Sequence, residues 1–252
     1  ILRRNKKEVL TELPDKIEQN IILPFNDEEE KLYVANLAEV NKELQELYDL
    51  EGSDKMQILK LLTRLRQLCL EPRLVYDNID QPSSKLKACM ELIKTMQENK
   101  QKVLLFSSFT SVLDLIAEEC QKAGITYYML TGSTNKEDRR ELVSRFQKDD
   151  TTVFLISLKA GGTGLNLTSA EAVIHFDPWW NVSAQNQATD RAYRIGQKNN
   201  VQVFNLVMKD SVEEKIIELQ KRKKELADMF VENNSGGLSQ MSKEDILSLF
   251  TM

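Results

Sequence analysis

Short apolar runs alternate with helix-length amphipathic segments through the middle of the chain. The runs are KVLLFS, TYYML, TVFLIS, AVIHF and VQVFNLVM, at residues 102–107, 126–130, 152–157, 172–176 and 201–208. Runs of this length, rich in branched and aromatic residues, are typical of buried strands. Strands that alternate with helices indicate βαβ units, in which helices cover both faces of a parallel sheet. Residues 82–210 are therefore predicted to form an open α/β domain.

The intervening helices are predicted from caps and apolar periodicity. They cover 84–99, 110–123, 135–148 and 183–194. Ligands of such sheets bind beyond the carboxyl ends of the strands. The loops that follow Ser107, Leu130, Ser157 and Phe176 are therefore the first places to look for a functional site.

The two flanks of this domain have a helical pattern. Asn26 is a predicted N-cap followed by three glutamates, which the helix dipole favours in a first turn. A second helix is predicted over 54–69, and a long charged helix over 210–232 precedes a short one over 242–250. The sequence thus predicts a helical segment at 24–81 and further helices at 211–252.

Composition narrows the class of protein. The chain has 252 residues and a net charge of -5, and no run approaches the roughly 20 apolar residues of a membrane span. Cys69, Cys89 and Cys120 are scattered without C-x-x-C spacing, so neither a disulfide framework nor a zinc site is indicated. The chain opens at Ile1 without a signal-peptide pattern, and we expect it to be a piece of a longer protein.

A glycine-rich loop, SLKAGGTGLNLTSAE, follows the predicted strand at 152–157. Gly161, Gly162 and Gly164 permit close approach to a phosphate or to another chain segment, and Lys159 adds a cation. This pattern alone does not distinguish a phosphate-binding loop from an ordinary tight connection between two elements. The loop is not a P-loop, because the chain contains no G-x-x-x-x-G-K-[ST] string.

The stretch NQATDRAYRIGQ carries two arginines three residues apart. In a helix that runs from Ser183 to Arg194, the spacings of four and three place Gln187, Arg191 and Arg194 on one face. The opposite face offers Ala184, Ala188, Ala192 and Ile195 for packing. Guanidinium groups match phosphate oxygens two at a time and suit a triphosphate whose charge must be stabilised during cleavage. A surface helix whose arginines pair with acids such as Asp190 stays the alternative.

The segment LISLKAGGTGLNLTSAEAVIHFDPWWN, followed by QNQATDRAYRIGQ, resembles motifs V and VI of the Swi/Snf-type ATPases. These are DNA translocases of helicase superfamily two. VLLFSSFTSVLDLI resembles their motif IV, YYMLTGSTNKEDRRELVSRFQ the segment after it, and LRRNKKEVLTELPDKIE the exit from their first RecA-like lobe. The resemblance covers nearly the whole chain. It implies a linker at 1–23, a helical insertion at 24–81, a second RecA-like lobe at 82–210 and brace helices at 211–252.

The resemblance also implies a nucleotide site. In this family ATP with Mg²⁺ binds between two RecA-like lobes, and the first lobe supplies the phosphate-binding loop and the magnesium-binding acids. Arg191 and Arg194 are then arginine fingers, with Gln187 and Gly164 near the nucleotide. Such a finger is worth about 10³–10⁵ in rate. Without the first lobe the chain is expected not to hydrolyse ATP.

Contacts with double-stranded DNA are implied for motifs IV and V and their surroundings. The matching residues are Ser108, Phe109, Thr131, Gly132, Lys159, Gly162 and Trp179. Such contacts to phosphates position a protein without reading sequence. For Trp179 and Trp180, packing between the loop and a helix remains the alternative to a DNA contact. The sole histidine, His175, is expected to pack in the core.

Two positions depart from the family pattern. Tyr193 stands where family members usually have histidine, and Val182 where they usually have proline. Neither departure removes a charge, so the finger arrangement is expected to survive.

The implied function is ATP-driven translocation on duplex DNA that remodels protein–DNA complexes. The expected partners are the first lobe and double-stranded DNA, and no membrane is expected. The protein is expected to be a monomer, located in the cytoplasm if it is bacterial and in the nucleus if it is eukaryotic. Two alternatives stay open, a strand-unwinding helicase and a non-catalytic binding module. DRAYRIGQ and DPWWN favour the translocase.

Overall fold

The computed structural model describes residues 14–49, 55–161, 164–229 and 249–250, and its chain forms two compact units. The first, here called the sheet unit, comprises Ile1–Asn20, Met90–Phe176 and Ser183–Asn205. The second, here called the helical unit, comprises Ile21–Cys89, Asp177–Val182 and Leu206–Met252. Each unit is thus assembled from segments that lie far apart in the sequence.

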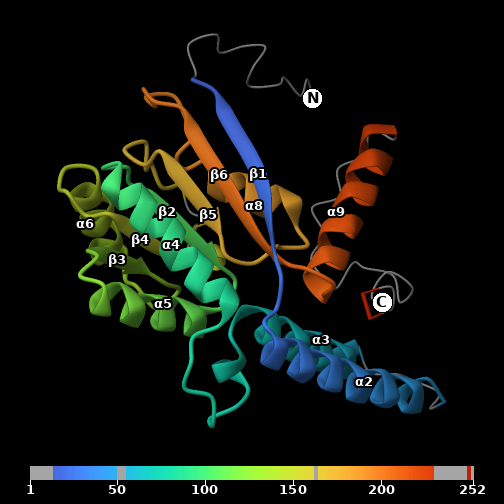
Figure 1. The fold of residues 1–252 in the computed structure, drawn as a ribbon. Coiled ribbons are helices and arrows are strands. Elements are labelled where there is room, and N and C mark those ends of the chain that lie inside the picture. The colour runs from blue at the N-terminus through green and yellow to red at the C-terminus, as the bar shows by residue number, and fades with distance from the viewer. Residues whose placement is uncertain (1–13, 50–54, 162–163, 230–248, 251–252) are drawn as a thin grey trace. The chain divides into compact units, whose positions relative to one another are not determined.

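A six-stranded sheet in the order β1-β6-β5-β2-β4-β3 is the centre of the fold (Figure 1). The strands are β1 (Lys16–Leu23), β2 (Val103–Ser107), β3 (Tyr127–Leu130), β4 (Val153–Ser157), β5 (Ala172–His175) and β6 (Val201–Met208). The pairs β6–β5, β5–β2, β2–β4 and β4–β3 are parallel. Strand β1 runs the same way as β6, since Val201 N donates to Asp15 O and Lys209 N donates to Leu23 O. The predicted parallel sheet is therefore confirmed.

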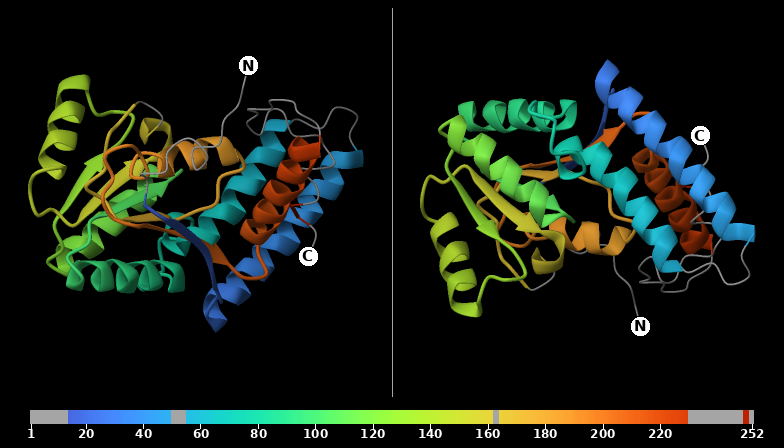
Figure 2. Two further views of the ribbon diagram at one scale, coloured as in Figure 1. Left: turned by 90° about the horizontal axis from the view of Figure 1, so that it is seen from above. Right: turned by 90° about the horizontal axis from the view of Figure 1, so that it is seen from below.

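Helices cover both faces of this sheet. They are α4 (Ser84–Glu98), α5 (Thr110–Lys122), α6 (Lys136–Phe146) and α8 (Val182–Thr189), with a short α7 (Leu158–Gly161) directly after β4. Figure 2 shows α6 and α8 on one face and α4 and α5 on the other. Every residue of β2, β4 and β5 is buried, because these strands pack against helices on both sides.

The helical unit is built around α2 (Asp27–Asp49), α3 (Lys55–Leu70) and α9 (Val212–Met229), with a 3-10 turn over Pro72–Leu74. Apolar stripes of the three helices form one core, with Leu37, Leu62 and Ile216 among its members. The predicted cap of α2 is confirmed, since Asn26 Oδ1 accepts hydrogen bonds from the backbone amides of Glu28 and Glu29. Among the described helices, none combines the length and apolar character that crossing a bilayer requires.

Two elements were not predicted. Strand β1 lies in the interval expected to be a linker, and its eight residues are mostly exposed, so that no apolar alternation marks it. The four-residue helix α7 is too short to leave a periodic signal. Most of the short helix predicted over 242–250 lies outside the described residues, as does the end of the charged helix beyond residue 229.

Candidate functional site

The segments predicted to contact DNA follow three neighbouring strands of the sheet unit. Ser108 and Phe109 follow β2, Thr131 and Gly132 follow β3, and Lys159 lies in α7 after β4. Because β2, β4 and β3 are parallel neighbours, these segments all emerge at the carboxyl ends of the strands, on the same side of the sheet unit. Lys159 and Gly132 are exposed, and the other three are half-buried. Gly162 lies outside the described residues, and Trp179 belongs to the helical unit.

The turn after β3 is fixed by its own side chains. The Thr131 amide donates to Thr134 Oγ1 at 3.1 Å, and the Thr131 and Ser133 hydroxyls lie 2.8 Å apart. Asn135 then caps α6, since its Oδ1 accepts from the Asp138 amide at 2.9 Å. The turn is thereby joined rigidly to the start of α6. The roles of these residues toward DNA remain predictions.

Glycine is required for two different reasons in the loop after β4. A Cβ at Gly161 would lie 3.1 Å from Phe106 Cε1, so the small residue lets α7 pack closely on β2. Gly164 has φ +40°, in the left-handed region that other residues rarely adopt, and a Cβ there would meet nothing within 4 Å. Gly164 is exposed, and its place near a nucleotide stays a prediction.

Two arginines from different parts of the sheet unit hold the end of α7. Arg139 Nη1 donates to the Ala160 carbonyl at 3.1 Å, and Arg191 Nε donates to the Gly161 carbonyl at 3.1 Å. The Leu167 amide in turn donates to the Arg191 carbonyl at 3.0 Å. Consecutive carbonyls of the glycine-rich loop are thus tied to α6 on one side and to the residues after α8 on the other.

Two glutamines secure the rest of that loop. Gln147 donates through Nε2 to the Asn166 carbonyl at 2.7 Å and accepts through Oε1 from the Ser169 amide at 3.1 Å. Buried Gln197 donates to the Ala170 carbonyl at 2.8 Å. Sequence reasoning missed both glutamines. Gln197 closes the quoted string DRAYRIGQ and Gln147 closes YYMLTGSTNKEDRRELVSRFQ, so their positions in these motifs were the available signals.

The arginine-bearing segment is not the continuous helix that was predicted. Helix α8 ends at Thr189, and Arg191 and Arg194 lie in the turns that follow, so a shared helical face with Gln187 is wrong. The physical reason is that the Arg191 carbonyl bonds the Leu167 amide instead of an amide one turn further along. Ile195, expected to pack, is 70% exposed. Ala188 and Ala192 are buried as predicted.

The two guanidinium groups lie in different surroundings. Arg191 is half-buried, and its pKa is lowered first by burial and then by the positive charge of Arg194, while Asp190 opposes the shift. Arg194 is exposed, and among the described residues its side chain has no hydrogen-bond or ion-pair partner. Gln187 is exposed on α8. The fold therefore holds two like charges near each other, with the Asp190 carboxylate close enough to act on Arg191.

A chain of polar side chains, buried except at its exposed end Asn20, fixes α8 on the sheet. Asn205 Nδ2 of β6 donates to Asn20 Oδ1 of β1 at 2.9 Å, and Gln185 Nε2 of α8 donates to Asn205 Oδ1 at 2.9 Å. At the other end, His175 Nε2 lies 2.9 Å from Thr189 Oγ1. His175 is 1% exposed and stacks on Phe106, which confirms its predicted place in the core.

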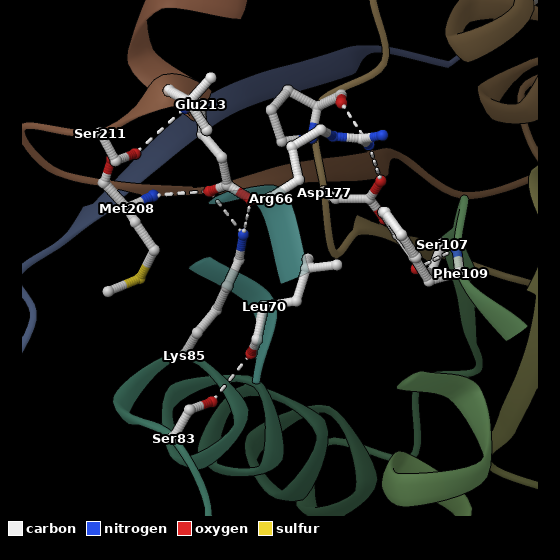
Figure 3. Close-up of polar contacts among 12 residues, drawn as sticks. Arg66, Leu70, Ser83, Lys85, Ser107, Phe109, Asp177, Met208, Ser211 and Glu213 are labelled. Carbon is white, nitrogen blue, oxygen red and sulfur yellow. Dashed lines mark hydrogen bonds and ion pairs between the residues drawn. The ribbon is translucent and has the colours of Figure 1, made fainter. Parts of the chain in front are cut away.

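The loop with both tryptophans packs within the helical unit. Arg66 of α3 pairs with Asp177 at 2.7 Å (Figure 3). The Arg66 guanidinium carbon also lies 4.2 Å from the centre of the Trp180 ring and 5.6 Å from that of Trp179. The Trp179 carbonyl accepts a hydrogen bond from Gln220 of α9. These contacts favour the packing interpretation for both indoles, and a DNA contact by Trp179 stays a prediction.

A buried ion pair is the second charged feature of the helical unit. Lys85 Nζ of α4 lies 2.7 Å from both carboxylate oxygens of Glu213 at the start of α9, and the Met208 amide donates to the same carboxylate at 2.8 Å (Figure 3). Both side chains are at most 1% exposed. Burial raises the pKa of Glu213, and the Lys85 charge opposes the shift. Within the described residues, no group of three or more His, Cys, Asp or Glu could hold a metal ion.

Two family models match the chain. The model described as the helicase conserved C-terminal domain matches residues 84–196, which include the glycine-rich loop and both arginines. The model described as the SNF2-related domain matches residues 1–74.

Curated relatives match along almost the whole chain. A Mycoplasma pneumoniae protein named "Uncharacterized ATP-dependent helicase" is 38% identical over 251 residues, which are 99% of this chain and 24% of the relative. The "ISWI chromatin-remodeling complex ATPase ISW1" of Saccharomyces cerevisiae is 34% identical over 269 residues, which are 99% of this chain and 24% of the relative. The chain thus spans about a quarter of the length of these curated relatives.

Solved structures share the fold. The C-terminal part of the Fun30 ATPase domain superimposes with a TM-score of 0.77 at 25% identity, covering 94% of this chain and 96% of that one. The Sulfolobus solfataricus SWI2/SNF2 ATPase core in complex with double-stranded DNA gives a TM-score of 0.74 at 32% identity, covering 98% of this chain and 53% of that one. Motifs, sheet topology and comparisons agree that the chain belongs to the SNF2-related (Swi/Snf-type) family of ATP-dependent helicases and carries the RecA-like helicase C-terminal domain of that family.

Proposed function

We propose that this chain is the second motor lobe of an ATP-driven double-stranded-DNA translocase that remodels protein–DNA complexes. ATP with Mg²⁺ binds between this lobe and a first RecA-like lobe elsewhere in the protein. Arg191 and Arg194 reach its phosphates as arginine fingers, with Gln187 and Gly164 beside the nucleotide. The observation that carries the proposal is the pair of like charges after α8.

Burial lowers the pKa of Arg191, and repulsion from the nearby Arg194 cation lowers it further. Arg191 is anchored through Nε on the Gly161 carbonyl, whereas Arg194 is exposed. An anion with several oxygens between two guanidinium groups would turn this repulsion into charge-assisted hydrogen bonds. A triphosphate is such an anion, and its charge shifts during cleavage, which is where an arginine finger acts.

Relatives and neighbours support the choice of partners. One curated relative is named an ATP-dependent helicase and another a chromatin-remodelling ATPase, and one solved neighbour is an SWI2/SNF2 core in complex with double-stranded DNA. The residues predicted to contact phosphates follow β2, β3 and β4 at the carboxyl ends of these strands. Contacts of that kind hold a duplex without reading its sequence, as a translocase requires.

The phosphate-binding loop and the magnesium ligands are assigned to the first lobe. This lobe therefore contributes charge stabilisation and DNA contacts, and alone it does not hydrolyse ATP. Closure of the two lobes brings the fingers to the phosphates, so that the state of the nucleotide controls the motion of the lobes along DNA.

The test is ATP turnover by the protein that contains both lobes, with and without duplex DNA. Arg194→Ala is expected to lower the DNA-stimulated rate by about 10³-fold or more, as loss of an arginine finger does. Lys198→Ala is the matched control, because Lys198 is an exposed cation four residues further on. A rate that DNA does not change, or that survives the loss of Arg194, would overturn the proposal.

A strand-unwinding helicase is the second candidate, since the matching family model is a helicase domain. The same protein can be given a forked duplex and, separately, a duplex that carries a third strand in its major groove. Displacement of the third strand without separation of the duplex supports translocation. ATP-dependent separation of the forked strands favours the helicase instead.

A further inference from the structure

The side chain of Arg139 bridges two segments to which the proposed function gives different roles. Arg139 lies in α6, one turn after the capped start of the helix, and donates to the Ala160 carbonyl at 3.1 Å. The next carbonyl of the loop, that of Gly161, accepts from Arg191. We propose that Arg139 is a positioning residue that couples the DNA-contacting turn after β3 to the arginine fingers. This inference rests on the proposed function.

The path between the two segments is short and continuous. The turn with Thr131 and Gly132 is joined to α6 by the Asn135 cap. From α6, Arg139 reaches the end of α7, and Arg191 reaches the same end from the other side. A displacement of the turn by bound DNA is therefore passed through the first turn of α6 to Arg139, then through the end of α7 to Arg191, three residues before Arg194.

Packing of α6 does not depend on this contact. Phe146 at the end of α6 is fully buried and lies 5.2 Å from Phe154 between ring centres. Leu142 and Val143 pack against the same core. Removing the Arg139 side chain therefore leaves α6 on the sheet and removes one of the two guanidinium contacts at the end of α7, which separates a role in coupling from a role in folding.

Arg140 provides a matched control on the same helix. It is the adjacent residue, carries the same charge and is exposed. General electrostatic attraction to DNA would be weakened equally by losing either arginine. Coupling through the Ala160 carbonyl would depend on Arg139, which donates to it, and not on Arg140.

The experiment uses the protein with both lobes and compares the wild type with R139A, R139K, R140A and R194A. Maximal ATP turnover at saturating duplex is measured for each, together with the dissociation constant for a fluorescent duplex without nucleotide. R139A is expected to lower the DNA-stimulated rate about tenfold, as changes along a coupling network can, while the dissociation constant changes by less than about threefold. R139K should recover most of the rate, because a lysine ammonium can donate to one carbonyl. R140A should match the wild type.

Other outcomes would overturn the inference. Equal losses of rate and of DNA affinity in R139A would make Arg139 a phosphate contact, and an unchanged rate would remove its role altogether. Equal defects in R139A and R140A would indicate general charge attraction. If R194A is inactive while R139A is fully stimulated, only the coupling fails. If the wild-type rate ignores DNA, the proposed function and the coupling fail together.

Discussion

Replacing Lys85 with methionine removes the ammonium group that lies 2.7 Å from both carboxylate oxygens of Glu213. Methionine keeps the length and apolar volume of the side chain, so the main change is the loss of charge. Glu213, at most 1% exposed, is then a buried carboxylate that keeps the Met208 amide as a hydrogen-bond donor. The variant is expected to fold with a clear loss of stability.

The magnitude follows from the burial of both partners. Breaking a buried ion pair by removing one member costs about 3–5 kcal/mol of unfolding free energy. Because the Met208 amide still stabilises the carboxylate, we expect a cost near the lower end, about 3 kcal/mol. Lys87→Met on the same helix is the control. Lys87 is exposed, and its replacement should change stability by no more than about 0.5 kcal/mol.

The cost should also depend on pH. Burial raises the pKa of Glu213 above its ordinary value of 4.5, and the Lys85 charge opposes this shift, so removing Lys85 raises the pKa further. Between pH 4.5 and its own raised pKa, Glu213 of the folded variant then binds a proton that the unfolded chain does not. Its unfolding free energy rises as pH falls, by at most about 1.4 kcal/mol per pH unit for one proton. The difference from wild type should therefore shrink as the pH is lowered toward 4.5.

Urea unfolding followed by tryptophan fluorescence measures these differences. The two tryptophans of the chain, Trp179 and Trp180, lie in the same unit as the ion pair. Lys85→Met with Glu213→Gln removes both charges and should recover much of the stability. The reasoning is refuted if Lys85→Met costs no more than Lys87→Met at pH 8, or if its cost stays constant as the pH is lowered.

Three further predictions concern the stability and reactivity of single side chains. Arg66→Met leaves fully buried Asp177 without its cation, so the same urea titration should show a loss of about 3–5 kcal/mol. Gly164→Ala forces a Cβ into the left-handed region and should cost about 1 kcal/mol in thermal unfolding, whereas Gly132→Ala, with open space and no positive φ, should be close to neutral. The three cysteines are buried, and burial raises the pKa of the Cys120 thiol to about 12, so at pH 8 a thiol reagent should label the chain only after unfolding. Rapid labelling of the folded chain would contradict this expectation.

The sequence predicted the interior of the sheet well because burial there leaves a strong local signal. Strands β2, β4 and β5 are buried on both faces, and each therefore appears as a continuous apolar run. The edge strand β1 gives no such signal, because most of its residues are exposed whether or not it pairs with β6. The exposure of β1 is the cause and not its place at the edge, since the other edge strand, β3, was predicted.

The conformation of the arginine-bearing segment was predicted only in part, and the roles of its residues stay predictions. The alanine spacing that suggests a helix to Arg194 is real, and Ala188 and Ala192 are buried. The helix stops because the Arg191 carbonyl bonds Leu167, a contact between distant segments. The buried Lys85 could not be predicted either, since lysine is ordinarily exposed and its partner lies 128 residues away.

The pairing of β1 with β6 has a consequence for synthesis of the chain. The amide of Asp15 donates to Asn200 Oδ1, 185 residues later, at 3.0 Å. At ribosomal rates of roughly 5–20 residues per second, β1 waits about 10–40 s before its neighbour exists. Ile17 and Ile22, 55% and 46% exposed even after folding, are open to other nascent chains throughout that interval. Lys16 and Glu18 flank Ile17 and place charge on the unpaired segment, which opposes edge-to-edge association. The charged residues of this strand thus oppose association of the nascent chain until β6 has been synthesised.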